Sequence, residues 1–255
     1  MSMRVLAFMA HPDDVEFKSA GTLARLKREA GCQIAIATAT SGDCGSAVQR
    51  PDEIARIRHA EALASAKVLD AEYYCAGCAD LFVMYNEENL RRFVEIVRKA
   101  RPDIVIAPPP MDYMVDHEVC SVLVRTACFG APIPNFWTAD VDPAPPIPAV
   151  PYLYYAALVD DKDIYGNPIE PSLVVDITEV QEVKKQMLAC HASQRDWLRK
   201  HHGIDEYIES MKRWDAAQGE RIGRPAGESF RQHVGHGYPQ DDVIAKLLKI
   251  DAGRK

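Results

Sequence analysis

Short, continuous apolar runs alternate along most of the chain with segments whose apolar residues recur at helical intervals. The runs predict strands at residues 5–10, 33–40, 72–75, 104–107, 152–158 and 173–176. The segments between them predict helices at residues 17–29, 53–69, 87–99, 117–129 and 179–199. Runs without polar interruption are typical of strands buried on both faces of a parallel sheet. The alternation therefore predicts an α/β fold built from right-handed β-α-β units.

The second half of the chain is less regular. Residues 130–151 are dense in proline and predict an extended excursion over the surface, at the rim of a pocket. The tail from His201 onward is polar and mixed, and no element is predicted in it. We expect a single domain over residues 1–255, with a core at 1–195 and a C-terminal extension at 196–255. The extension is expected to contribute to the pocket or to oligomer contacts.

The composition narrows the classes of function. Of the 255 residues, 47% are hydrophobic and 26% are charged, as in globular proteins. A net charge of -7, without a cluster of Lys and Arg, argues against a nucleic-acid partner. No stretch approaches a membrane span, and no G-x-G-x-x-G dinucleotide motif follows the first two strands. The seven scattered cysteines are typical of free thiols in a reducing compartment, so we expect a cytoplasmic protein without a membrane partner.

The strongest chemical signal follows the first predicted strand, where an apolar run leads into His11-Pro12-Asp13-Asp14. In proteins with parallel sheets, bound molecules and ions lie just beyond the carboxyl ends of the strands. His11 and Asp14 are then a nitrogen and an oxygen donor at that edge, which suits half of a zinc site. Asp13 can point towards a water on the metal. The same residues also suit a helix start with aspartate as the N-cap, so the motif alone leaves both interpretations open.

A second polar cluster follows the strand predicted at 104–107 and three prolines. It contains Asp112, Tyr113, Asp116 and His117. His117 begins a predicted helix, where the helix dipole disfavours a protonated histidine. A neutral histidine bound to a metal has a reason to occupy this position.

Two further pairs carry weaker signals. Cys75 and Cys78 form a C-x-x-C motif without a second pair or nearby histidines, and no helical pattern begins there. We interpret them as incidental thiols. Arg58 and Glu61 lie three residues apart on a predicted helix, where an ion pair is worth about 0.2–0.5 kcal/mol.

With these motifs placed, the sequence resembles the PIG-L/LmbE-like family of zinc-dependent N-deacetylases. The matching motifs extend over most of the chain and are Ala10-His11-Pro12-Asp13-Asp14, Ser41-Gly42-x-x-Gly45, Arg58-x-x-Glu61, Asp116-His117, Lys184, His191-Ala192-Ser193-Gln194 and Glu228-Ser229-Phe230. The first and fourth motifs are specific, and the others are individually weak but fall in the family's order. The resemblance implies a Rossmann-like, mostly parallel sheet with helices on both faces that carries no nucleotide.

The resemblance also implies a metal site. The family's ligands correspond to His11, Asp14 and His117, two histidines and a carboxylate that leave a position open for water, as in catalytic zinc sites. The general base corresponds to Asp13. It would take a proton as the water on the metal attacks an acetamide carbonyl, and return it to the leaving amine.

Further roles follow from the same resemblance. Asp116 is expected among the catalytic residues, where it helps to orient the site. Arg58 would bind substrate hydroxyls, and the alternative that it only forms an ion pair with Glu61 stays open.

One position departs from the family pattern. The second cluster of the family usually reads His-x-Asp-His, and Met114 stands here in place of the first histidine. A thioether neither stabilises an oxyanion well nor donates a proton. Either the reaction differs, the activity is weaker, or another residue serves as the donor. The candidates are Tyr113, at the substrate, and the tail histidines His233 and His236 of the same or a neighbouring subunit, with His233 preferred.

The sequence therefore favours a zinc-dependent hydrolase that removes an N-acyl group, with acetyl the first choice, from an amino-sugar-like substrate. Another divalent metal stays open. One alternative is a metal-dependent hydratase of an unsaturated dicarboxylate, because relatives of this fold catalyse that reaction with the same metal cluster. Another is a non-catalytic metal or sugar binder, against which Asp13 argues. The expected partner is a small N-acylated sugar or glycoconjugate, and the resemblance favours a homo-oligomer.

Overall fold

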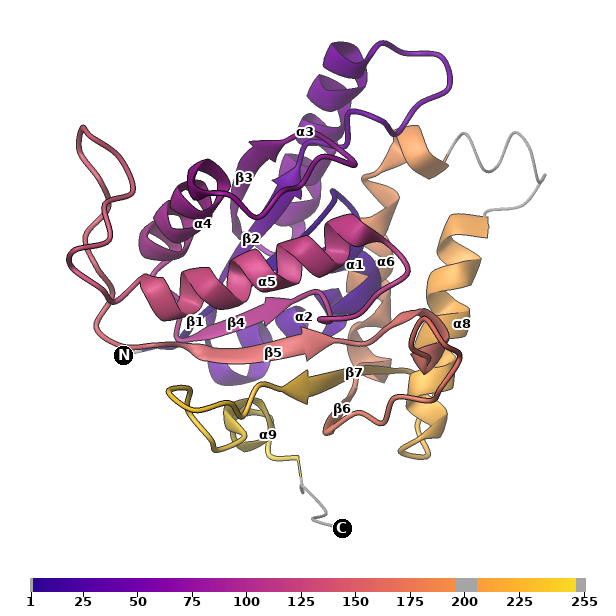
Figure 1. Cartoon of the computed structure of the whole chain (residues 1–255). Coiled ribbons are helices and arrows are strands. Elements are labelled where there is room, and N and C mark those ends of the chain that lie inside the picture. Colours follow the sequence, from indigo (N-terminus) through magenta and orange to yellow (C-terminus); the bar gives the residue numbers. More distant parts are fainter. Residues whose placement is uncertain (1, 196–205, 251–255) are drawn as a thin grey trace.

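A seven-stranded sheet in the order β3-β2-β1-β4-β5-β7-β6 organises the chain (Figure 1). The computed structural model describes residues 2–195 and 206–250. The strands are β1 (Arg4–Met9), β2 (Gln33–Thr40), β3 (Glu72–Cys78), β4 (Ile104–Ala107), β5 (Tyr152–Ala156), β6 (Leu173–Asp176) and β7 (Gly227–Gln232). Strands β1 to β5 pair in parallel, whereas β7 lies antiparallel between β5 and β6. The predicted α/β fold with a mostly parallel sheet is confirmed.

Helices pack on both faces of the sheet. They are α1 (Asp14–Lys18), α2 (Ala20–Ala30), α3 (Pro51–Val68), α4 (Glu87–Ala100), α5 (Val115–Gly130), α6 (Gln181–Ala189), α8 (Glu206–Glu220) and α9 (Val243–Leu247), with short 3₁₀ turns at η1 (Val159–Asp161) and η2 (Thr178–Val180). In Figure 1, α4 and α5 lie on one face of the sheet, and α2 lies on the other.

The alternation of side chains along β1 divides the core into two layers. Leu6 and Phe8 belong to the layer formed with α4 and α5, and Phe8 stacks on Phe93 of α4 with ring centroids 4.5 Å apart. Ala7 and Met9 belong to the layer formed with α2, α6 and α9. Because both faces of β1 are buried, the strand is apolar without interruption, as the sequence indicated.

Two predicted helices differ from the structure. The segment predicted as one helix at 17–29 forms α1 and α2, because the backbone breaks at Ser19 (φ -151°). The helix predicted at 179–199 begins with η2 and continues as α6, which ends at Ala189. Its last predicted residues, 196–199, lie outside the described residues.

The tail is structured where the sequence predicted no element. It supplies α8, α9 and β7, and β7 lies inside the sheet rather than at its edge. The polar residue Glu228 of β7 is buried because its carboxylate accepts hydrogen bonds from the backbone N–H groups of Gly21 and Thr22, at 2.9 and 2.7 Å. These partners lie far away in the sequence, so the local pattern does not reveal the strand.

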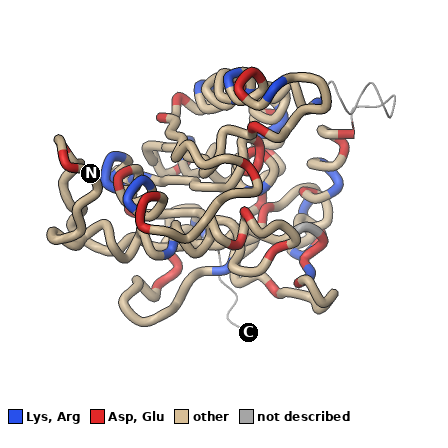
Figure 2. Tube along the Cα trace, turned by 45° about the horizontal axis from the view of Figure 1, so that its top comes forward, with Lys and Arg blue, Asp and Glu red and all other residues tan. Residues whose placement is uncertain are grey.

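Charged residues of both signs are interspersed along the helices, as Figure 2 shows. Within the described residues, no helix combines the length and the apolar character needed to cross a membrane.

Candidate metal centre

Two neighbouring parallel strands bring the predicted ligands together. His11 follows β1 and Asp14 begins α1, while His117 lies in the first turn of α5, the helix after β4. Because β1 pairs with β4 in parallel, the segments that leave their carboxyl ends meet at one edge of the sheet. Helix α1 begins within the motif that follows β1, with Asp13 at the N-cap position, but the Asp13 side chain makes no capping hydrogen bond there, and the role of the motif as metal ligands stays a prediction.

The three ligand atoms are spaced as a tetrahedral zinc site requires. His11 Nδ1 lies 3.2 Å from His117 Nε2, and Asp14 Oδ2 lies 3.5 Å from each of these nitrogens. Ligand atoms at zinc bond lengths of about 2.0–2.1 Å are separated by roughly 3.3–3.4 Å in a tetrahedron. All three side chains are almost buried. The donor set and its spacing therefore fit a divalent metal ion.

Two carboxylates contact the histidines at the ring nitrogens that are not candidate metal ligands. His11 Nε2 lies 3.1 Å from Asp116 Oδ2, which also accepts a hydrogen bond from Leu81 N at 2.7 Å. His117 Nδ1 lies 3.0 Å from Asp112 Oδ1. A carboxylate at the outer nitrogen fixes the orientation of a metal-binding imidazole and increases its basicity. Asp112 stood in the second polar cluster of the sequence, but its role was not predicted.

The electrostatics of the cluster favour positive charge. Burial lowers the pKa of His11, but the carboxylates of Asp116 and Asp14 outweigh burial and raise this pKa to about 10. Burial likewise lowers the pKa of His117, and Asp14 and Asp112 raise it above its ordinary value. Although burial opposes ionisation of Asp14, the two histidines hold its pKa well below the usual range. A bound cation would supply the positive charge that these carboxylates favour.

Asp13 is held beside the cluster by two donors from distant parts of the chain. Its Oδ2 accepts hydrogen bonds from Arg58 Nη2, at 3.2 Å, and from the hydroxyl of Tyr207 in α8. The backbone of Asp13 has φ 109°, a conformation that is costly for a residue with a side chain. Burial raises the pKa of Asp13 and the nearby Arg58 guanidinium lowers it, with a net rise. A carboxylate with a raised pKa suits proton transfer.

Arg58 does not form the ion pair with Glu61 that the sequence allowed, and this alternative is wrong. The carboxylate of Glu61 instead accepts hydrogen bonds from the N–H and hydroxyl of Ser193, both at 2.7 Å. Arg58 is buried and donates to Pro12 O at 2.6 Å as well as to Asp13. Its guanidinium packs so tightly on Gly42 (φ +75°) that a Cβ there would lie 2.5 Å from Arg58 Nη1. Glycine in this loop therefore makes room for Arg58.

The ligands and Asp13 line a cavity of about 280 Å³. Tyr113 and Met114 form part of its wall, and the ring of Tyr113 packs edge-on against His117 with centroids 5.5 Å apart. Asp80 also lines it, and was not predicted because no motif surrounds it. Its Oδ2 accepts a hydrogen bond from Cys44 N at 2.9 Å, whereas its buried Oδ1 has no partner among the described residues. Asp80, in the wall of the cavity, thus keeps one buried carboxylate oxygen without a partner in the described part of the chain.

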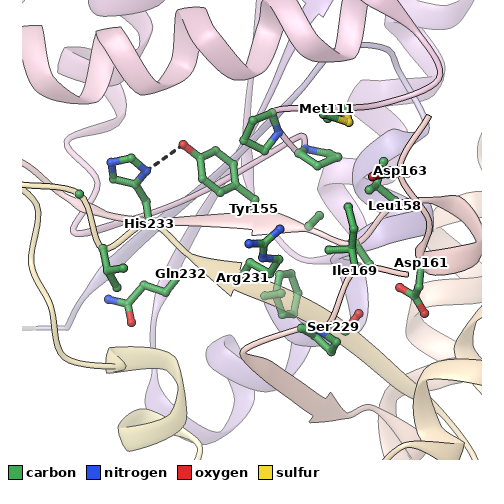
Figure 3. A pocket seen from close by; sticks show the side chains of 18 residues that line it. Met111, Tyr155, Leu158, Asp161, Asp163, Ile169, Ser229, Arg231, Gln232 and His233 are labelled. Carbon is green, nitrogen blue, oxygen red and sulfur yellow. Dashed lines mark hydrogen bonds between the residues drawn. The ribbon is translucent and has the colours of Figure 1, made fainter. Parts of the chain in front are cut away.

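The tail histidines do not lie with this cluster within the chain. His233 lines a separate cavity of about 480 Å³, where its Nδ1 lies 3.1 Å from the hydroxyl of Tyr155 (Figure 3). His236 is exposed. A role for His233 in the reaction stays a prediction.

Lys184, Cys75 and Cys78 do not line the cavity at the candidate metal centre. Lys184 Nζ is fully buried and donates to Asp215 Oδ1 and Glu228 Oε1, at 2.6 and 2.8 Å. Cys75 and Cys78 lie on β3, where Cys75 Sγ donates to Thr40 O and burial raises the pKa of the Cys78 thiol to about 11.

The chain is similar to known deacetylases over much of its length. A family model described as PIG-L, GlcNAc-PI de-N-acetylase, matches residues 6–128. The diacetylchitobiose deacetylase of Thermococcus kodakarensis is 29% identical over 201 residues, which cover 75% of this chain and 70% of that protein.

Two solved structures share the fold. The N,N'-diacetylchitobiose deacetylase from Pyrococcus horikoshii, complexed with its inhibitor MPG, has a TM-score of 0.75 at 26% identity and covers 91% of this chain and 84% of its own. GalB, the 4-carboxy-2-hydroxymuconate hydratase of Pseudomonas putida, has a TM-score of 0.74 at 19% identity. The match covers 94% of this chain and 100% of GalB. The second likeness concerns the fold alone. These matches confirm the predicted resemblance: the chain is similar to the PIG-L/LmbE-like family, whose model matches residues 6–128.

Proposed function

We propose that the protein is a zinc-dependent hydrolase that removes an N-acetyl group from an amino-sugar-like substrate. The observation that carries this proposal is the zinc-like spacing of His11, Asp14 and His117, with Asp13 held beside them. The prediction of an amide-hydrolysing enzyme is confirmed by the family model and by the relatives, which are named deacetylases. Two nitrogens and one oxygen favour zinc, although another divalent metal can occupy such a site.

The side chains have distinct roles in this proposal. A bound divalent ion supplies polarisation of the acyl carbonyl and a lowered pKa for water. Asp13 accepts the proton of the attacking water and passes it to the departing amine. Arg58 and Tyr207 hold the Asp13 carboxylate through its Oδ2. Asp116 keeps His11 in orientation.

Substrate binding is proposed for three residues of the cavity. Tyr113 is exposed at its mouth, and the free Oδ1 of Asp80 is an acceptor for a sugar hydroxyl. The guanidinium of Arg58 lines the same cavity, but its bonds to Pro12 and Asp13 favour a role in positioning the base over direct hydroxyl binding. Because Tyr207 reaches Asp13 from α8, we also propose that residues beyond 195 contribute to the pocket.

Hydration of an unsaturated dicarboxylate is the second candidate. The observation that favours it is Met114, which lines the cavity at the position where the family usually has a histidine. An acyl-transfer site needs a donor for the developing oxyanion, and a thioether cannot act as one. We keep His233, from a neighbouring subunit of a homo-oligomer, as the proposed replacement donor.

One assay separates the candidates. Zinc-loaded protein is incubated with N-acetylglucosamine, with diacetylchitobiose and with an unsaturated dicarboxylate, and primary amine, acetate and loss of the conjugated absorbance are measured. We expect equal amounts of amine and acetate from at least one sugar. Loss of absorbance from the dicarboxylate, with no amine from either sugar, would instead identify a hydratase.

A further inference from the structure

The loop that contains Met111 and Tyr113 separates a second cavity from the one at the candidate metal centre, which we call the catalytic cavity. The second cavity has a volume of about 480 Å³, and its wall is largely apolar, with Met111, Leu158, Ile169 and Phe230 among the residues that line it (Figure 3). Met111 lines this cavity, whereas Tyr113, two residues later, lines the catalytic cavity. Two residues of extended chain span about 7 Å, so one loop separates the two spaces.

Strand β7 presents two unused hydrogen-bonding groups to this second cavity. Ser229 and Arg231 both line it, two residues apart and therefore on the same face of the strand. Ser229 is 1% exposed, and its Oγ has no hydrogen-bond partner among the described residues. The side chain of Arg231 is exposed and forms no hydrogen bond or ion pair with the described residues, and Figure 3 shows its guanidinium between Tyr155 and Ile169.

The acidic residues of the wall are engaged elsewhere. Asp161 Oδ2 accepts hydrogen bonds from Gln218 Nε2 at 2.6 Å and from Arg221 Nη2 at 3.1 Å. Asp163 Oδ1 accepts from the backbone N–H groups of Tyr165 and Asn167 in its own turn, at 2.9 and 2.8 Å. Arg221 thus neutralises Asp161, whereas Asp163 keeps its charge in an exposed turn, and Arg231 is the arginine that lines the cavity.

The buried hydroxyl of Ser229 favours a ligand with a hydrogen-bonding group, and the guanidinium of Arg231 favours a negatively charged one. The apolar wall favours a ligand with an aromatic or aliphatic body. One guanidinium matches one negative charge, which is the charge of a carboxylate rather than of a phosphate dianion.

We infer that the second cavity is the subsite for the aglycone of the substrate, and that it takes an apolar group bearing a carboxylate. This inference rests on the proposed deacetylase function, and it names the kind of conjugate on which the enzyme acts. The sugar would occupy the catalytic cavity while the aglycone passes the loop between Met111 and Tyr113. Arg231 and Ser229 would bind the carboxylate.

The test compares two substrates that differ in one charge, phenyl N-acetyl-β-glucosaminide and its 4-carboxyphenyl analogue. Amine release is measured with zinc-loaded protein. We expect kcat/KM to be about tenfold higher for the carboxylate, as for a charge-assisted hydrogen bond at a partly open site. Arg231→Gln should abolish this preference, so that the two substrates have the same kcat/KM.

Two variants sharpen the result. Arg56→Gln removes an exposed arginine of α3 that lies outside both cavities, and it should preserve the preference. Ser229→Ala should reduce the preference about threefold, because it removes the weaker, neutral donor. Equal kcat/KM for the two substrates in the unaltered protein would overturn the inference, as would a preference that survives Arg231→Gln.

A binding measurement keeps the inference testable if the proposed function fails. When neither glycoside releases amine, calorimetry compares 4-hydroxybenzoate with 4-hydroxybenzamide. Binding of the acid alone, lost in Arg231→Gln, supports a carboxylate subsite in a protein with another reaction. Equal binding of the acid and the amide overturns the inference. Binding of neither compound also overturns it, and this is the result expected if a second copy of the chain fills the cavity.

Discussion

Asp13 shows how single residues prepare the site. Its Oδ2 is bound by Arg58 of α3 and by Tyr207 of α8, so these two elements fix the orientation of one carboxylate. The backbone strain at φ 109° persists because these contacts and the following helix determine the conformation. A carboxylate that is already oriented loses little entropy during the reaction.

Tyr207→Phe tests this arrangement. The hydroxyl stabilises the ionised form of Asp13 and so lowers its pKa, against the larger effect of burial, which raises it. Removing the hydroxyl should therefore raise the pKa of Asp13 and move the acidic limb of the kcat/KM profile to higher pH. We expect a loss of about tenfold at neutral pH, consistent with a hydrogen bond to a charged group. An unchanged pH profile would mean that Tyr207 only packs against Phe17.

Met114→His tests the missing donor. A histidine at the start of α5 would line the catalytic cavity and could donate to an oxyanion. One such donor is worth about 10²–10³ in rate. If the chain lacks a replacement, amine release by Met114→His should increase sharply while His233→Ala and Tyr113→Phe change little. A large loss in His233→Ala alone would instead identify His233 as the relocated donor.

At the scale of elements, a buried lysine joins the tail to the sheet. Lys184 of α6 lies between Asp215 of α8 and Glu228 of β7, and it also donates to Phe17 O at 2.9 Å. The carboxylate of Glu228 in turn binds the N-terminus of α2. This network fixes the position of α8, and with it the position of Tyr207.

Lys184→Met should destabilise the fold strongly. The substitution leaves two buried carboxylates without their shared cation, and breaking such a pair typically costs about 3–5 kcal/mol. Denaturant unfolding monitored by circular dichroism measures the change. Lys185→Met is the matched control, because Lys185 is paired with Glu182 at the surface, where such pairs contribute less than about 1 kcal/mol. Equal stability of the two variants would contradict a structural role for the network.

At the scale of the whole molecule, the sequence predicted the parts of the fold that local pattern controls. The uninterrupted apolar run of β1 and the helical spacing of α4 were sufficient to predict these two elements, because both are buried by neighbouring strands and helices of the β-α-β units. β7 was missed because it contains the polar residues Glu228 and Ser229, which are buried in the fold. Glu228 is buried with distant hydrogen-bond partners, and Ser229 lies in the wall of a cavity. Tyr207 was missed because its contact with Asp13 joins segments 194 residues apart.

The candidate ligands were predictable for a physical reason. Polar residues in the segments that follow buried parallel strands gather at one edge of the sheet, and His11 and His117 do so. The carboxylates that orient them are harder to assign. Asp112 and Asp116 share one cluster in the sequence, but the pairing of Asp112 with His117 and of Asp116 with His11 follows only from the geometry.

Metal binding should stabilise the whole molecule. A ligand present at 100 times its dissociation constant increases the free energy of unfolding by about 2.7 kcal/mol. This corresponds to an increase in Tm of roughly 5–10 °C for a chain of this size. Differential scanning calorimetry with and without zinc measures the shift. His11→Ala should abolish it, whereas a variant with Cys75→Ser and Cys78→Ser should retain it. A shift that survives His11→Ala would place the metal elsewhere.

The central claim is that the His11, Asp14 and His117 cluster holds a catalytic metal beside a general base. The most direct test is amine release from an N-acetylglucosamine conjugate by the unaltered protein and by Asp13→Asn, with metal content measured in both. The amide keeps the size of Asp13 but cannot accept a proton, so we predict equal metal content and a loss of activity of about 10²–10⁴-fold. Turnover within a few-fold of the unaltered protein, at equal metal content, would contradict the account.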